Sequence, residues 1–275
     1  MTWGTRFGLV VVTFFIGISI LSPWISPFQS DQIFQDSLKL PPVWTELGQK
    51  QFILGTDDLG RDILSRLIHG APVSLGLGFL VVVFSILFGT LLGLLAGTRG
   101  GWVDQVCTRF MDIIMALPSM LMAIVVIAIL GPSFVNTIIS LGIVGIPSIF
   151  RIVRASSLVE IQKNYVVAAK TFGAGWFRIA FSHVLPNCLA PLIVQSTLGL
   201  SNAILDAAAL GFLGLGAQPP TPEWGTMLSD ARSFIESSPW MVTLPGLCIL
   251  LVVIGFNLLG DALRDKLDPR LKKIA

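Results

Sequence analysis

Long stretches without Asp, Glu, Lys or Arg dominate the chain, and each is long enough to cross a bilayer, which takes about 20 apolar residues. The run 113–150 would extend about 57 Å as a single helix. Gly131-Pro132-Ser133 in its middle is a turn signal that divides it. The five runs lie at 7–30, 67–98, 113–150, 179–205 and 237–260. The pattern therefore predicts six transmembrane helices, at about 7–26, 73–97, 107–130, 134–152, 188–211 and 240–260.

The composition supports a membrane protein. Hydrophobic residues make up 53% of the 275 residues and charged residues only 12%, against about 25% in soluble domains. These values exclude an ordinary soluble enzyme and a disordered chain. The net charge of +2 gives no reason to expect nucleic acid as a partner. We expect an all-α, multi-pass membrane protein that contacts membrane lipid.

Basic residues predict the orientation. A cleaved signal peptide is disfavoured because Arg6 alone precedes the first run and Ser22-Pro23-Trp24 is a poor cleavage site. Six crossings leave both termini on one side, and most of the 18 lysines and arginines lie on that side, which predicts cytoplasmic termini. The basic residues concerned are Arg6, Arg99, Arg109, Arg151, Arg154, Lys163, Lys170, Arg178, Arg264, Lys266, Arg270, Lys272 and Lys273.

Four regions follow from this topology. Residues 1–26 form the first transmembrane helix, and 27–72 form an outer, periplasmic segment. Residues 73–260 form a five-helix core that contains an inner loop at 153–187, and 261–275 form a cytoplasmic tail. Within the outer segment Ile63, Leu64, Leu67 and Ile68 fall on one helical face, so we expect an amphipathic helix on the bilayer surface.

Acidic residues precede this amphipathic helix. Asp57 or Asp58 could cap its first turn. A calcium site made by these two and Asp62 is less favoured, because the spacing does not fit a calcium-binding loop. The chain has two histidines, His69 and His183, and its cysteines are widely spaced, so we predict no metal site.

The inner loop reads as two short helices, 158–172 and 176–185. Gly173-Ala174-Gly175 separates them and Pro186 ends the second. On these residues alone, the loop could lie on lipid headgroups or dock a cytoplasmic partner.

The same loop resembles the "EAA" loop of ABC importer permeases, whose pattern is Glu-Ala-Ala, three residues, Gly, nine residues, then Ile-x-Leu-Pro. Val167 stands in place of the Glu and His183 in place of the Ile, departures that are also typical of the peptide-importing branch. The matching residues are Ala168, Ala169, Gly173, Leu185 and Pro186.

Three further stretches, 55–66, 203–230 and 257–272, resemble the C-type permease subunit of that dipeptide, oligopeptide and nickel branch. The run 203–216 is most similar to dipeptide permeases, because oligopeptide-type subunits tend to carry Glu where this chain has Ala207. The resemblance implies a type I ABC importer permease fold and a subunit of an ATP-driven importer for dipeptides or short peptides. It also implies a location in the bacterial cell (inner) membrane.

The resemblance also implies partners. These are a homologous second permease, two ABC ATPase subunits and an extracytoplasmic substrate-binding protein. The chain has no Gly-x-x-x-x-Gly-Lys-Ser/Thr loop, so we expect a transport subunit rather than an enzyme, with ATP and Mg²⁺ held by the ATPases. The ATPase contact is expected at the inner loop, at Tyr165, Ala168, Ala169, Lys170, Gly173 and Ala174, with Leu185 and Pro186 completing the motif.

Asp206 is the carboxylate that lies well inside a predicted span, where an unpaired acid is costly and therefore a functional candidate. It could line the path and meet the ammonium end of a peptide. Alternatively, it could bond to Asn202 one turn earlier or to the second permease. Beyond the fifth span, a segment rich in Gly and Pro leads to Glu223 and Trp224, which we expect at a gate or at the seat of the binding protein.

Gly89, Gly93 and Gly97 repeat every four residues in the second span. Such a stripe of small residues lets another helix approach closely, so we predict a packing role.

Other functions stay open at this point. The same architecture could import nickel chelates, haem or antimicrobial peptides. A secondary carrier would usually show an internal repeat and more intramembrane ionisable groups. An intramembrane protease using Asp206 and Asp261 is disfavoured, because Asp261 follows the last span.

Overall fold

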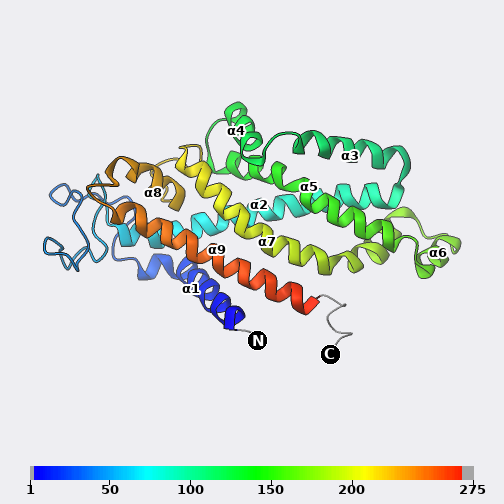
Figure 1. Cartoon of the computed structure of the whole chain (residues 1–275), viewed down its shortest axis with the longest axis horizontal. Helices are drawn as coiled ribbons and strands as arrows, with labels where there is room; N and C mark the ends of the chain where they lie inside the picture. The colour runs from blue at the N-terminus through cyan, green and yellow to red at the C-terminus, as the bar shows by residue number, and fades with distance from the viewer. Residues whose placement is uncertain (1–2, 268–275) are drawn as a thin grey trace.

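The computed structural model describes residues 3–267, which form a long helical bundle (Figure 1). A π-helical segment, Arg178–Val184, leads into α7, and a 3₁₀ turn, Arg232–Phe234, follows α8. The α-helices are α1 (Trp3–Ile25), α2 (Ile63–Arg99), α3 (Gly101–Met115), α4 (Ser119–Leu130), α5 (Phe134–Glu160), α6 (Asn164–Thr171), α7 (Leu185–Phe212), α8 (Trp224–Ala231) and α9 (Trp240–Leu267).

The bundle has two distinct ends (Figure 1). At one end lie α8 and an irregular lobe, residues 26–62, which joins α1 to α2. At the other end lies α6. Helix α1 starts, and α9 finishes, on the side facing away from the lobe.

Within residues 3–267, five helices are long and apolar enough to cross a membrane, and the pair α3–α4 would make a sixth crossing. The predicted all-α fold with six spans is therefore confirmed, but the third span is broken. We predicted one helix at 107–130; instead, α3 starts at Gly101, and α3 and α4 meet at an angle of 91°. Pro118 lies at the break, where its ring and missing N–H disfavour a continuous helix.

The second span starts earlier than predicted. Asp62 caps α2, its Oδ2 accepting the N–H of Ser65 at 2.8 Å. The helix then passes Pro72 without ending and continues to Arg99. The separate surface helix expected before Pro72 is thus wrong, because those residues are the first turns of α2. Its apolar stripe is buried inside the protein, with Ile63 only 1% exposed.

The inner loop also differs from its predicted boundaries. Helix α5 continues to Glu160, and the first short helix is only α6. Gly173 follows α6 with φ +83°, as a helix-ending glycine does. We expected Pro186 to end a helix, and this prediction is wrong. Pro186 lies in the first turn of α7, where proline's missing N–H is tolerated.

Helices α2 and α5 pack along the glycine stripe. A Cβ added at Gly89 would lie 2.7 Å from the Ile149 Cβ, and one at Gly93 would lie 2.9 Å from the carbonyl oxygen of Phe150. At Gly97 it would lie 2.6 Å from the Ser157 Cβ. The backbones therefore approach so closely that only glycine fits at these positions.

Candidate translocation cavity and coupling loop

A cavity of about 390 Å³, lined by both polar and apolar side chains, lies between α2, α4, α5 and α7. Helix α7 contributes one face to it, with Gln195, Gly199, Asn202 and Asp206 at helical spacing. The other lining residues are Val81, Val82, Ser85, Ser119, Leu141, Val144, Gly145, Ser148, Ile149, Ser196 and Ala203.

Asp206 is half-buried on this face of α7. Among the residues that the structure describes, its carboxylate has no hydrogen-bond or ion-pair partner, so the alternative bond to Asn202 is not formed. An unpaired acid in a span is stable only if water or a cationic group meets it. The cavity gives Asp206 the access to water that an unpaired acid in a span requires.

Sequence reasoning missed several residues of this cavity. Gln195 lies three turns from Asp206 on the same face, and that spacing could have revealed it. Ser85 and Ser148 come from α2 and α5, and only the packing of those helices brings them to α7. Ser85 also donates to the carbonyl oxygen of Gly142 at 3.0 Å, which ties α2 to α5 beside the cavity.

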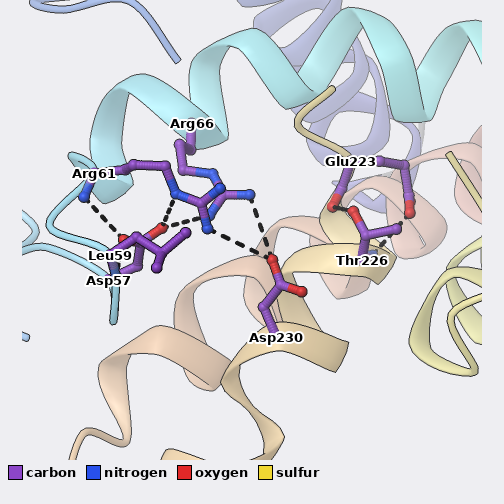
Figure 2. A network of polar contacts seen from close by, with 7 residues as sticks. All are labelled: Asp57, Leu59, Arg61, Arg66, Glu223, Thr226 and Asp230. Carbon is purple, nitrogen blue, oxygen red and sulfur yellow. Dashed lines mark hydrogen bonds and ion pairs between the residues drawn. The ribbon is translucent and has the colours of Figure 1, made fainter. Parts of the chain in front are cut away.

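Glu223 lies away from the cavity and is 1% exposed. It caps α8 by accepting the N–H of Thr226 at 2.8 Å (Figure 2). It also accepts the N–H of Gly225 at 2.8 Å, and Ser74 Oγ lies 3.4 Å away. Burial raises the pKa of Glu223, and these hydrogen bonds to the carboxylate oppose the rise. The carboxylate thus holds the start of α8 against α2.

Trp224 is fully buried next to it. Its indole N–H donates to the carbonyl oxygen of Leu67 at 3.1 Å, and its ring meets Phe15 edge-on at 5.6 Å. Both residues proposed for a gate or a binding-protein seat are therefore interior anchors in this structure, and neither lines the cavity with Asp206.

A buried ion-pair network lies beside them (Figure 2). Asp57 accepts from Arg61 Nε at 2.7 Å and also pairs with Arg66. The carboxylate of Asp230 on α8 lies 3.7 Å from both guanidinium groups. The helix cap predicted at Asp57 or Asp58 is wrong, because Asp62 holds that position and Asp57 joins the lobe to α2 and α8.

Tyr165 joins three parts of the inner loop. Its hydroxyl donates to the carboxylate of Glu160 at the end of α5 and accepts from Asn187 Nδ2 at 3.0 Å. Desolvation and the bond to Glu160 raise the pKa of Tyr165 to about 12, so the hydroxyl stays a donor. Val166 is buried on the same short helix. The loop is therefore a packed unit rather than a loose connection.

The loop also bonds to the end of α2. Trp176 Nε1 donates to Thr98 Oγ1 at 2.8 Å, and the Arg99 guanidinium lies 4.9 Å from the centre of the indole ring. These two contacts hold the inner loop against the end of α2.

The tip of the loop is exposed. Of the residues expected at the ATPase contact, Tyr165, Ala168, Lys170 and Gly173 are exposed, and Ala169 and Ala174 are partly covered. At the second half of the motif, Leu185 is partly covered and Pro186 is exposed. Sequence reasoning did not single out Phe172 and Phe177, whose exposures of 91% and 72% form an apolar surface at the tip.

Comparison with known proteins identifies the family. The pattern of the binding-protein-dependent transport system inner membrane component matches residues 89–273. The dipeptide transport system permease protein DppC of Escherichia coli (strain K12) is 55% identical over 98% of this chain and 90% of its own length. The di/tripeptide transport system permease protein DppC of Pseudomonas aeruginosa is 53% identical over 99% of this chain and 90% of its own.

Solved structures agree on the fold. The inward-facing MetNI methionine ABC transporter matches with a TM-score of 0.59 at 20% identity, over 74% of this chain and 96% of that one. An amino acid ABC transporter matches with a TM-score of 0.56 at 14% identity, over 73% and 94%. The sequence-based assignment to the ABC importer permeases is confirmed. The chain belongs to the family of inner membrane components of binding-protein-dependent transport systems.

Proposed function

We propose that this chain is a membrane-spanning subunit of an ATP-driven importer for dipeptides or short peptides and forms half of the translocation path. The observation that carries the proposal is the 51–55% identity, over 98% or more of the chain, to proteins named as dipeptide or di/tripeptide permeases. The similarity extends across the lobe, the cavity and the inner loop alike.

The inner loop is the coupling element in this proposal. Its exposed aromatic tip offers a surface to an ATPase subunit, and the bonds from Trp176 and Tyr165 transmit movement to α2 and α5. ATP and Mg²⁺ belong to the two partner ATPases, so this chain is a transport subunit without hydrolytic activity of its own. The inward-facing and outward-facing conformations of such a bundle differ in free energy by a few kcal/mol.

The remaining partners follow from the same architecture. A homologous second permease completes the path, and a substrate-binding protein delivers peptide at the end that carries the lobe. In this proposal the chain lies in a bacterial inner membrane, with the lobe on the outer side and with both termini and α6 in the cytoplasm.

Purification of the chain from detergent-solubilised membranes through a C-terminal tag tests this assembly. Mass spectrometry should find a second six-helix permease and ATPases with a Walker A loop. In liposomes, the purified complex should import labelled dipeptide when ATP is present in the lumen, on the side of the ATPases. Recovery of the chain alone, still moving solute, would instead identify a secondary carrier.

A further inference from the structure

Three polar side chains on α7 face the cavity without a partner. Gln195, Asn202 and Asp206 form no hydrogen bond or ion pair with any residue in the described part of the chain. Asn202 is exposed, and Gln195 and Asp206 are only half-buried. All three lie on the face of α7 that lines the cavity, so their polar atoms are open to water or to a molecule that enters the cavity.

The charge of the lining restricts what those partners can be. Asp206 is the one charged residue among the described residues around the cavity, and the other polar groups are neutral amides and hydroxyls. A carboxylate in a membrane span that lacks a counter-charge attracts a cationic group. The lining therefore favours a passing molecule that presents a positive charge to α7.

The spacing along α7 fits the two ends of a short peptide. Asn202 and Asp206 are one turn apart, about 6 Å along the helix axis. An extended dipeptide spans about 7 Å. When its ammonium group meets Asp206, a carbonyl or carboxylate oxygen comes within reach of the Asn202 amide, which can donate two hydrogen bonds.

On the basis of the proposed function, we propose that Asp206 is a specificity-determining residue that binds the free α-ammonium group of a peptide in transit. Asn202 donates to an oxygen of the same peptide. The cargo of this site is the class of short peptides with a free, positively charged N-terminus. Among the described residues that line the cavity, none is a cation that could meet the carboxylate end of the peptide.

The first test uses the complete complex in liposomes with its binding protein. Asp206→Asn should lower the maximal rate of uptake of a zwitterionic dipeptide about ten- to a hundredfold, the range for losing a hydrogen bond to a charged group. Asp206→Glu should retain most of the uptake. Asp265→Asn, an exposed carboxylate at the end of α9, is the control and should match the wild type.

A second readout separates transit from coupling. ATP hydrolysis stimulated by the loaded binding protein should persist in Asp206→Asn while uptake falls. Unchanged uptake, or an equal loss of stimulated hydrolysis, would overturn the proposal. A wild-type complex that imports no dipeptide would instead overturn the proposed function.

The variant Asn202→Asp tests the transit site even if the Asp206→Asn chain does not assemble with its partner subunits. This variant keeps Asp206 and adds a second carboxylate one turn away on the same face. The uptake of a lysine-containing dipeptide relative to a glutamate-containing one should rise several-fold over the wild-type ratio. A ratio equal to that of the wild type would contradict a transit site on this face, because a purely structural role does not distinguish peptide charge.

Discussion

The indole N–H of Trp224 donates a 3.1 Å hydrogen bond to the carbonyl oxygen of Leu67, across 157 positions of sequence. The acceptor, Leu67, lies in the second turn of α2, before Pro72. A single side chain thus fastens the segment after α7 to the lobe end of the bundle.

Replacing Trp224 with Ala should be strongly destabilising. The side chain is fully buried, and removal of a buried Trp costs about 3–5 kcal/mol. Thermal unfolding of the purified protein in detergent should show a clearly lower Tm. Trp102→Ala, at a site 74% exposed, is the matched control and should leave Tm nearly unchanged. Equal Tm values for the two variants would contradict the anchor role.

Glu223 should make stability depend on pH. Burial raises the pKa of Glu223 above its ordinary value of 4.5, so the folded protein holds this proton to a higher pH than the unfolded chain does. The contribution of Glu223 to stability is therefore greatest below pH 4.5 and declines as pH rises through the raised pKa. The difference in Tm between the wild type and Glu223→Gln should change as the pH rises from 4.5 through the raised pKa of Glu223. A difference that stays constant over this pH range would contradict the role of Glu223 in the pH dependence of stability.

The glycine stripe between α2 and α5 should tolerate no side chain. A Cβ at Gly93 would lie 2.9 Å from both the Phe150 carbonyl oxygen and the Val153 Cβ, and such overpacking costs about 1–3 kcal/mol. Gly93→Ala should lower Tm. Gly76→Ala is a close control because it lies in the same helix with no atom within 4 Å, and it should be neutral or stabilising. A lower Tm for Gly76→Ala than for Gly93→Ala would contradict the packing role of the glycine stripe.

Gly173 should be needed for coupling rather than for folding. Its φ of +83° is costly for a β-branched residue, while no neighbouring atom lies within 4 Å. Gly173→Val should leave the protein inserted but separate ATP hydrolysis from peptide uptake in the reconstituted complex. Gly175→Val tests the same volume change without a positive φ and should retain uptake. Full uptake by Gly173→Val would count against the loop as the coupling element.

The sequence predicted the number of spans and the family because both depend on local signals: apolar run length and motif spacing. The apolar stripe at Ile63 and Leu67 was correctly assigned to a helix, but the prediction that it lies on the bilayer surface was wrong. A local pattern shows that a face is covered, whereas Trp224, which covers this one, comes from the far half of the chain.

The candidate site shows the same limit. Asp206 was identifiable because an acid inside an apolar run is conspicuous, and Glu223 because it follows a proline-rich segment. Their different roles depend on burial: Glu223 is enclosed and hydrogen-bonded, whereas Asp206 faces a cavity and has no partner in the described chain. Ser85 and Ser148 join the site only through the packing of α2 on α5.

Helix α2 passes unbroken from the lobe to the inner loop, about 55 Å at 1.5 Å per residue. Asp62 caps one end beside the ion-pair network, and Arg99 lies over Trp176 at the other. Pro72 lies in the third turn of this helix, and the chain continues as one helix beyond it. A single element therefore joins the lobe to the inner loop, so a tilt of α2 would displace the ion-pair network and Trp176 together.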